Sequence, residues 1–464
     1  MEDESNRTFR ELLPPLNLLP LLTSYTMDHV AVSTYWIFFG IFLSEEVTDS
    51  YLDIAVVLAV PAIISIIGTT ILSSFSDKTG RRKELILFAK IALMTQYILL
   101  LFFRGSIWSI LAILGIFGIF TQIYYSQHSA LITTICPPDR KGQVSSYQVF
   151  FASAGWMIGS ALSDIIYDWQ GITGSLGFAA GFALLAGIVA MVSTSKPYSQ
   201  REELIDDPIL NESKISDVVI KNQTMRTAES IKSTESTASY FEIFKRKKVI
   251  SLLIALAILD FGFGPFNVIT SVYFKRVYML NFNDSELANT LIAKSNTIAT
   301  AIGMVILLVS GSILDRTGRK PIFILSIVAY PILYTLMFTL SEHPWALFCI
   351  YLYPLYAVKV PTANTVMADL TAENERGRGM SLINIEQIVF GNLGAIFGCY
   401  IADVFPGDII PRFVPEGIYI IPIFPMIFGI IALILGILLV KETNPRVLAK
   451  LDAKEKMASG LKNL

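Results

Sequence analysis

Ionisable residues stand inside long apolar stretches of this 464-residue chain, where a charged side chain is costly and commonly has a functional role. Asp28 lies about 13 residues into the first stretch, or ~20 Å along a helix, which places it near the middle of a bilayer. Asp260 has a similar depth in the seventh stretch. Because His29 is the only basic residue within four positions of Asp28, little stabilises its charged form, and this carboxyl group is predicted to bind and release a proton. Asp260 is the competing candidate, and a structural carboxyl bonded to a neighbouring helix is the alternative for both.

Two further charges occupy consecutive stretches near the C-terminus. Lys359 and Glu386 each lie ~12–15 Å from the inner end of their stretch. We expect them to form a buried ion pair, which makes each charge tolerable in lipid, and both a structural and a functional role are open. Lys90 is nearer an end and is expected to extend to the surface. Amide side chains at depths compatible with a polar cavity are Gln122, Gln148, Asn267, Asn296, Asn384 and Gln387.

The residues around the two aspartates carry local signals. His29 points about 100° away from Asp28 around the helix, so it is expected to pack in the interior without relaying a proton to Asp28. Gly262-x-Gly264-Pro265 follows Asp260 and predicts a loosened seventh helix. Broken helices mark binding sites in transporters, and a simple proline kink is the alternative.

Two short polar segments repeat one pattern of charges and glycine. Residues 76–83 read Ser-Asp-Lys-Thr-Gly-Arg-Arg-Lys, and residues 314–321 read Leu-Asp-Arg-Thr-Gly-Arg-Lys-Pro. Each glycine permits a tight turn, and each aspartate ends a helix, where it needs a cation or another helix N-terminus beside it. Asp139-Arg140 likewise matches Glu375-Arg376, and Asp28 matches Asp260. The similar offsets predict two homologous halves.

The elements that must position these residues are predicted from hydropathy. The chain is 53% hydrophobic and 16% charged, with a mean hydropathy of +0.58, and a bilayer needs about 20 apolar helical residues per crossing. Twelve helices are expected near residues 15–44, 51–75, 83–103, 105–135, 142–167, 171–194, 247–274, 287–314, 320–340, 344–370, 379–404 and 417–441. The predicted divisions are an N-terminal six-helix bundle (1–194), a polar cytoplasmic linker (195–246), a C-terminal six-helix bundle (247–441) and a cytoplasmic tail (442–464).

Basic residues set the expected orientation. With both termini in the cytoplasm, the outer loops carry only Arg104, Lys275, Arg276 and Arg412, and most of the 36 basic residues lie inside. This asymmetry predicts a multi-pass protein of the cell membrane with both termini cytoplasmic. The first polar residues lack the pattern of a cleaved signal, so the first apolar stretch is expected to stay in the mature protein.

The doubled loop motif resembles that of a known family. Gly311-x-x-x-Asp315-x-x-Gly318-Arg319-Lys320 is similar to the loop between the second and third helices of each half in the major facilitator superfamily, with Ser73 at the usual glycine of the first copy. The resemblance implies an all-α integral membrane protein of two pseudo-symmetric six-helix bundles around a cavity that opens alternately to each side. It places Asp28 and Asp260 on cavity-lining helices and implies a cytoplasmic gate. The gate residues are Asp77, Gly80, Arg81, Arg82, Arg140, Gly311, Asp315, Gly318, Arg319, Lys320 and Arg376.

The motifs also bear on the substrate. Proton-coupled drug exporters carry an arginine upstream of a Gln-Gly step in the fourth helix, whereas here Ile119 and Ile123 accompany Gln122. The segment from Arg140 to Gln148 resembles the start of helix five in sugar porters. We therefore predict a secondary active, proton-coupled transporter of a small polar solute, sugar-like or an organic acid. Efflux of amphipathic drug-like compounds and a non-transporting membrane receptor are the alternatives.

Other classes find little support in the sequence. The chain has three histidines and three scattered cysteines without metal-ligand spacing, and its apolar stretches are not accompanied by a nucleophile–base set, so we predict no enzyme activity and no metal site. The lack of a basic tract with interleaved aromatic residues argues against nucleic acid. The expected partners are the small-molecule substrate, protons and membrane lipid. No cofactor other than a proton gradient is expected, and the resemblance implies a monomer.

Overall fold

The structure is a computed structural model that describes residues 14–79, 81–135, 141–193, 240–353, 356–372, 375–405, 417–444 and 447–448. In these ranges the chain is helical and contains no β-strand. The N-terminal elements are α1 (Leu19–Phe42), its π-helical continuation η3 (Leu43–Val47), α2 (Tyr51–Thr79), α3 (Arg82–Phe103), α4 (Ile107–Ile135) and α5 (Lys141–Val192). The C-terminal elements are α8 (Tyr240–Phe244), α9 (Lys247–Phe282), α10 (Ser285–Thr317), α11 (Arg319–Thr339), α12 (Pro344–Tyr351), α13 (Tyr356–Leu370), α14 (Arg376–Val404), η7 (Gly417–Ile420) and α15 (Ile423–Leu439).

These elements make twelve membrane passages. Ten helical segments among the described residues are long and apolar enough to cross a bilayer. One of them, Tyr147–Val192, has 46 residues. As one straight helix it would be on the order of 70 Å long, far beyond a hydrocarbon core of about 30 Å. Gly171, with a φ of +59°, breaks it into two passages. The short helices α12 and α13 together supply the remaining passage, so the predicted twelve-helix fold is confirmed.

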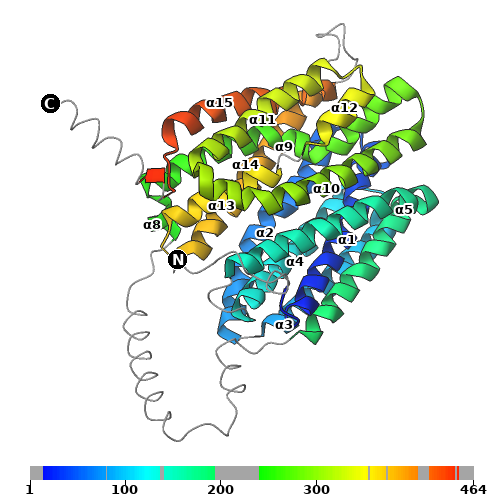
Figure 1. Ribbon diagram of the computed structural model, residues 1–464. Helices are drawn as coiled ribbons and strands as arrows, with labels where there is room; N and C mark the ends of the chain where they lie inside the picture. The colour runs from blue at the N-terminus through cyan, green and yellow to red at the C-terminus, as the bar shows by residue number, and fades with distance from the viewer. Residues whose placement is uncertain are drawn as a thin grey trace, which may run out of the picture.

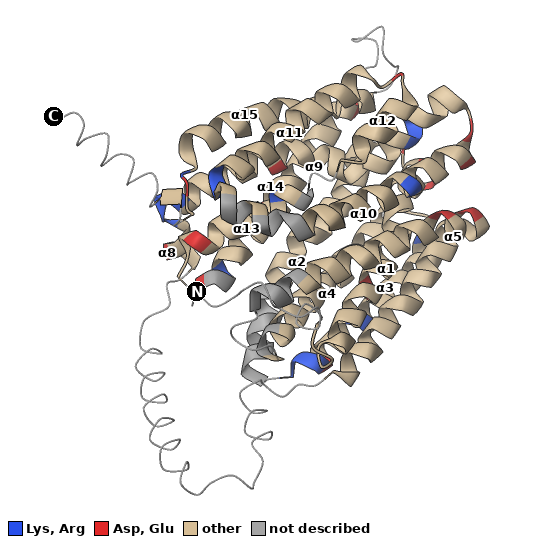
Figure 2. Ribbon diagram, viewed as in Figure 1, with Lys and Arg blue, Asp and Glu red and all other residues tan. Residues whose placement is uncertain are grey.

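The passages form two bundles (Figure 1). Helices α1 to α5, coloured blue to teal, lie together, and α9 to α15, coloured green to red, form the second group. Lys, Arg, Asp and Glu gather toward the ends of the helices, and few stand at mid-length (Figure 2). This pattern is expected when the helix middles face lipid or one another, because charge is costly there.

Glycines bring the first and fifth passages of each half into close contact. A Cβ atom at Gly155 of α5 would lie 2.9 Å from the His29 Cβ of α1, and one at Gly264 of α9 would lie 2.8 Å from the Ala395 amide nitrogen of α14. Small residues let helix backbones approach closely where no water drives association. Gly155 and Gly391, which faces Asp260, are separated by the same 236 positions as Arg140 and Arg376. The repeat is therefore visible in the packing as well as in the motifs.

Polar contacts between the halves are found at the end of the bundles opposite α8, here called the far end. Lys275 of α9 forms an ion pair of 3.0 Å with Glu45 of η3. The Thr290 hydroxyl of α10 donates to Asp164 of α5 at 3.1 Å. Asp403, near the end of α14, accepts hydrogen bonds from the start of α2. Because α5 also packs on α10 and α2 packs on α14, the two halves are joined along these pairs of helices.

Two details differ from the sequence-based boundaries. Helix α9 continues to Phe282, beyond the expected end near residue 274. It also has a non-helical backbone at Ile269, four residues after Pro265. The hydrogen bond that Pro265 cannot donate would reach Phe261 on its other side, so this break is not the loosening predicted beside Asp260. The predicted linker lies mainly outside the described residues. Its last part is the helix α8, which packs on α9 and α14 and buries Ile243.

Candidate functional site

The N-terminal bundle contains a buried ion pair between Asp28 of α1 and Lys90 of α3. The two residues are 1% and 0% exposed. The Lys90 ammonium also lies 3.3 Å from the ring centroid of Tyr124, a cation–π contact. The expectation that Lys90 extends to the surface is wrong, and so is the view of Asp28 as a carboxyl without a cation beside it. Lys90 sits beside Gly187 of α5, where a Cβ atom would approach the Lys90 Cβ to 2.9 Å, so its stem is enclosed by protein.

Aromatic and histidine rings surround this pair. The Tyr25 ring stacks on His128 with centroids 4.6 Å apart and also contacts His29. His128 bonds the Leu21 carbonyl oxygen through Nε2 at 2.8 Å, and Gln148 lies 3.2 Å from its other ring nitrogen. Gln148, predicted as a cavity residue, thus orients a buried histidine. Gln122 is half-buried on α4, among residues that do not line the cavities described below.

The C-terminal bundle contains a second buried ion pair, between Asp260 of α9 and Lys359 of α13. The predicted partner of Lys359 was Glu386, and this pairing is wrong. Lys359 pairs with Asp260 although α13 packs against both α9 and α14. Glu386 of α14 is 6% exposed, and neither of its carboxylate oxygens has a hydrogen-bond partner in the described part of the chain.

The two ion pairs are related only in part by the repeat. Their aspartates occupy matching positions, 232 residues apart, on the first helix of each half. Their lysines do not match, because Lys90 belongs to the third passage of its half and Lys359 to the fourth. Each half therefore neutralises its buried aspartate from a different neighbouring helix.

A cavity of about 460 Å³ lies between the two halves. The N-terminal half contributes His29 of α1 and Trp156 of α5, among other residues. The C-terminal half contributes polar and aromatic side chains from five helices: Asn267 and Thr270, Asn296, Tyr330 and Tyr334, Tyr351, and Gln387. A smaller cavity of about 120 Å³ shares Trp156, Asn267, Thr270, Asn296 and Tyr351 with it and extends to Trp36 and Gly40.

The lining combines polar, aromatic and aliphatic side chains, the last including Leu333, Met337 and Ile350, and it carries no acidic or basic residue other than His29 among the described residues. Amides offer both donors and acceptors, and aromatic rings offer flat apolar faces. Asn267, predicted as a cavity residue, lines both cavities. His29 lines the larger one, which differs from the interior packing expected for it, although its Nδ1 atom is held 2.9 Å from the Tyr25 carbonyl oxygen.

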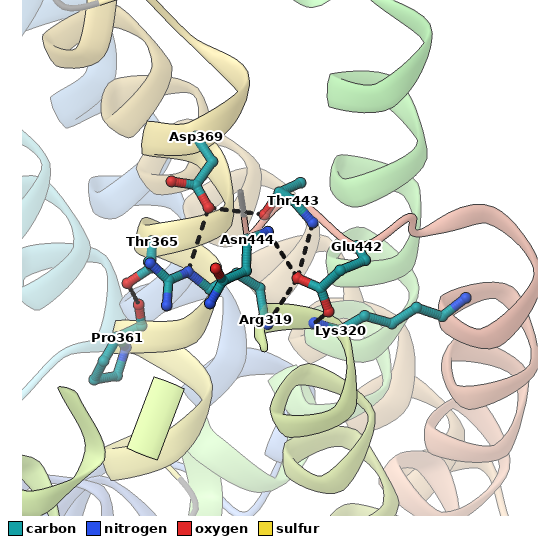
Figure 3. Close-up of polar contacts among 8 residues, drawn as sticks. All are labelled: Arg319, Lys320, Pro361, Thr365, Asp369, Glu442, Thr443 and Asn444. Carbon is teal, nitrogen blue, oxygen red and sulfur yellow. Dashed lines mark hydrogen bonds and ion pairs between the residues drawn. The ribbon is translucent and has the colours of Figure 1, made fainter. Parts of the chain in front are cut away.

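The second copy of the gate motif is tied to its own half (Figure 3). The Arg319 guanidinium lies 3.3 Å from the Asp369 carboxylate at the end of α13. Glu442 accepts hydrogen bonds from the backbone amides of Arg319 and Lys320 at 2.9 and 3.1 Å. These amides begin α11, and a carboxylate at a helix N-terminus is favourable because the first amides have no partner within the helix.

Other gate residues are placed with less detail. In the first copy, the Arg82 guanidinium donates to the Ala130 carbonyl oxygen of α4 at 3.2 Å, and Arg81 is exposed. Gly318 has a φ of +100°, a backbone conformation that favours glycine, which agrees with the predicted tight turn. Gly80 and Arg140 lie outside the described residues, and Asp77, Gly311, Asp315 and Arg376 are described by their helical backbone alone.

Comparison with known proteins assigns the family. A model of the Major Facilitator Superfamily matches residues 21–358 and 295–462. The chain belongs to this superfamily. No curated protein matches the sequence.

Solved structures of this superfamily share its architecture. A D-xylose-proton symporter superposes with a TM-score of 0.68 at 13% identity, covering 92% of this chain and 98% of that one. The nucleoside transporter NupG gives 0.66 at 11%, covering 91% and 98%. A bacterial homolog of the human lysosomal transporter Spinster, in an inward-facing and occupied conformation, gives 0.67 at 14%, covering 91% and 95%. At these identities the likeness is one of fold.

Several residues of the candidate site could not be predicted from the sequence. Lys90 was recognised as a charge in an apolar stretch, and its pairing with Asp28 depends on the approach of α1 and α3, which no local pattern records. Trp156, Tyr334 and Tyr351 line the cavity, yet in a sequence with 12% aromatic residues nothing separates them from ring-packing positions elsewhere. The bidentate ion pair of Arg246 with Glu375, at 2.7 and 2.9 Å, was also not anticipated.

Proposed function

We propose that this protein is a secondary active transporter of a small neutral polar solute that contains a ring, such as a sugar or a nucleoside, and that its transport is coupled to protons. The observation that carries the proposal is the central cavity, which offers amide, hydroxyl and aromatic groups and no charged side chain among its described lining residues. Amides match the hydroxyl groups of such a solute, and rings stack on its apolar face. An organic acid would bring an uncompensated charge into this lining.

The structural neighbours agree with this choice of substrate class. NupG is a nucleoside transporter, and another neighbour is a D-xylose-proton symporter. Both names describe transport of uncharged ring compounds, and the second also describes proton coupling. Efflux of amphipathic compounds is the competing proposal, which Phe263 and Phe266 in the cavity lining would suit.

Alternating access follows from the arrangement of the halves. We take the far end to be the outer face of the cell membrane, with both termini and the linker in the cytoplasm, as the distribution of basic residues predicts. The contacts of Glu45 with Lys275 and of Asp164 with Thr290 then hold the outer face closed. Transport requires these contacts to break while the cytoplasmic side closes.

A binding and flux assay tests the proposal. Purified protein is screened by thermal shift with uridine, D-xylose, lactate and rhodamine, and counterflow of each radiolabelled compound is measured in liposomes. We expect uridine or D-xylose to raise the melting temperature and to exchange, because a ligand of the native state stabilises it. Asn267→Leu should abolish both effects, whereas Gln122→Leu, an amide outside the cavity, should retain them. Binding of lactate alone would contradict the neutral substrate class, rhodamine transport would favour efflux, and binding without flux would favour a receptor.

A further inference from the structure

Glu386 is a buried carboxyl group that the cavity does not use. It lies one residue before Gln387, which lines the cavity, and it is 6% exposed. Both of its carboxylate oxygens lack a hydrogen-bond partner in the described part of the chain. An ionised carboxylate in such surroundings loses its hydration without replacement, which costs several kcal/mol.

The position of Glu386 is fixed by the packing of α9 on α14. A Cβ atom at Gly394 of α14 would lie 2.6 Å from the Phe261 carbonyl carbon of α9, and Gly264 of α9 packs on the backbone of Gly391. Helices this close cannot take an alternative register without clashes. Gly391 faces the Asp260 carbonyl oxygen, so Glu386, five residues before Gly391, stands somewhat more than one helical turn from the level of Asp260, toward the end of the bundle that carries α8.

The charged groups around Glu386 do not balance. Asp260 and Lys359 interact electrostatically with it, and Lys359 is already paired with Asp260. Tyr330 of α11 interacts electrostatically with the same pair. Helices α2 and α8 also pack on α14, and their described carboxylates interact with other residues. Asp53 of α2 accepts a hydrogen bond from Thr48, and Glu242 of α8 interacts with Arg246. Two carboxylates and one ammonium leave a net charge of −1, which one bound proton would remove.

We propose that the coupling proton binds to Glu386, and that the neighbouring pair of Asp260 and Lys359 makes this binding reversible. This rests on the proposed proton-coupled transport. When a proton from water binds a Glu386 oxygen, the cluster is neutral and Lys359 stays with Asp260. When the proton leaves, Lys359 is attracted to both carboxylates. Gln387 follows Glu386 on α14, and Asn267 lies on α9, the helix of Asp260. This change in charge therefore acts on two helices that line the cavity.

The second half of the repeat is thereby distinct from the first. At the offset of 236 that relates the matching glycines of α5 and α14, Glu386 corresponds to Phe150, so the N-terminal half has no carboxyl group at this position. Its pair of Asp28 and Lys90 is balanced in charge. The proton role that the sequence favours for Asp28 therefore moves, in this proposal, to the C-terminal half.

Infrared spectroscopy tests proton binding without a substrate. The wild-type protein in detergent is expected to show at neutral pH a carbonyl band of a protonated carboxylic acid that is absent from Glu386→Gln. Asp260→Asn should also lose this band, although Glu386 is retained, because Lys359 is then free to pair with the ionised Glu386. An unchanged band in Glu386→Gln would overturn the assignment, and a band that persists in Asp260→Asn would overturn the shared lysine.

Transport separates this inference from the proposed function. In liposomes with an acidic exterior, uptake of uridine and of D-xylose is measured for the wild type, for Glu386→Gln and for Glu286→Gln, an exposed carboxyl on α10. We expect Glu386→Gln to keep counterflow and lose accumulation driven by the pH gradient, while Glu286→Gln keeps both. Gradient-driven accumulation by Glu386→Gln overturns the inference alone. A wild type that exchanges solute but ignores the pH gradient overturns proton coupling itself, and the infrared result then still reports on Glu386.

Discussion

The ion pair of Asp28 and Lys90 allows two charged side chains to be buried inside the N-terminal bundle. Neither charge could be buried there without the other. Breaking such a pair by removing one partner leaves an uncompensated charge, which costs about 3–5 kcal/mol in buried sites. Replacing both partners by apolar groups costs much less, because no charge is left behind. The near-complete burial of both residues places them in this regime.

Substitutions at this pair should therefore be non-additive. Lys90→Met is expected to lower stability by about 3–5 kcal/mol, because Asp28 remains buried and unpaired. The double variant Asp28→Leu with Lys90→Met should recover most of the loss. Thermal unfolding of the purified variants in detergent measures both effects. Equal melting temperatures for the single and double variants would show that the pair does not act as a unit.

At this scale, the sequence identified the charges but not their partners. Asp28, Asp260, Lys359 and Glu386 were all singled out, because a charge in an apolar stretch is visible in one dimension. Which lysine meets which aspartate is decided by helix packing over separations of 62 and 99 residues, and the expected pairing of Lys359 was wrong for this reason.

At the scale of the elements, the start of α11 is bound by a residue more than 120 positions later in the chain. Glu442, just after α15, accepts hydrogen bonds from the first amides of α11 and from the amides of Thr443 and Asn444 at 2.9 and 2.8 Å (Figure 3). Burial alone would raise the pKa of Glu442, but the four backbone N–H donors together outweigh it and hold this pKa below its usual range. The ionised form thus joins the C-terminal segment to α11.

This contact predicts a pH-dependent stability. Because the pKa of Glu442 is lower in the folded than in the unfolded protein, its contribution is complete above the unfolded value and is lost as the pH falls through the folded value. We expect Glu442→Gln to melt at a lower temperature than the wild type at neutral pH, with the difference shrinking on acidification. Melting curves in detergent across this pH range check it. Glu342→Gln, an exposed carboxyl in the turn before α12, should follow the wild type throughout, and a difference for Glu442→Gln that is constant with pH would contradict the role of the charge.

The helices themselves were largely predictable, because long apolar runs between polar breaks have few alternatives in a membrane. The departures have physical causes. The end of α9 extends beyond its apolar core because Lys275 and Arg276 are carried on the helix, where Lys275 reaches Glu45. The separate helices α12 and α13 replace one continuous passage, an interruption that hydropathy does not register.

For the whole molecule, the proposed outer closure depends on a small number of polar contacts between the halves. The Asp403 carboxylate accepts from the amides of Tyr51 and Leu52, each at 2.8 Å, and from the Ser50 hydroxyl at 2.7 Å. It caps the N-terminus of α2 from the opposite half, where the helix dipole favours a negative charge. Separation of the outer ends must break this cap.

Loss of the cap should shift the conformational equilibrium. Asp403→Ala is expected to disfavour the outward-closed state by about 1 kcal/mol, or about fivefold in population. Distances between spin labels placed on the outer ends of α2 and α14 report this shift as a larger fraction of long distances. Asp53→Asn is the control, since its carboxylate bonds Thr48 within the same half. Identical distance distributions for Asp403→Ala and the wild type would show that the cap does not bias the equilibrium.

The chemistry of the Asp403 cap has a genetic consequence. Two of its three donors are backbone amides, which every residue other than proline supplies, so most substitutions at Tyr51 and Leu52 leave those donors in place. Heritable variation in the contact is therefore concentrated at Asp403 and Ser50. In a screen of variants for restored substrate uptake starting from Asp403→Ala, revertants at position 403 and compensating changes at the Glu45–Lys275 and Asp164–Thr290 contacts should be recovered, and substitutions at Tyr51 and Leu52 should be rare.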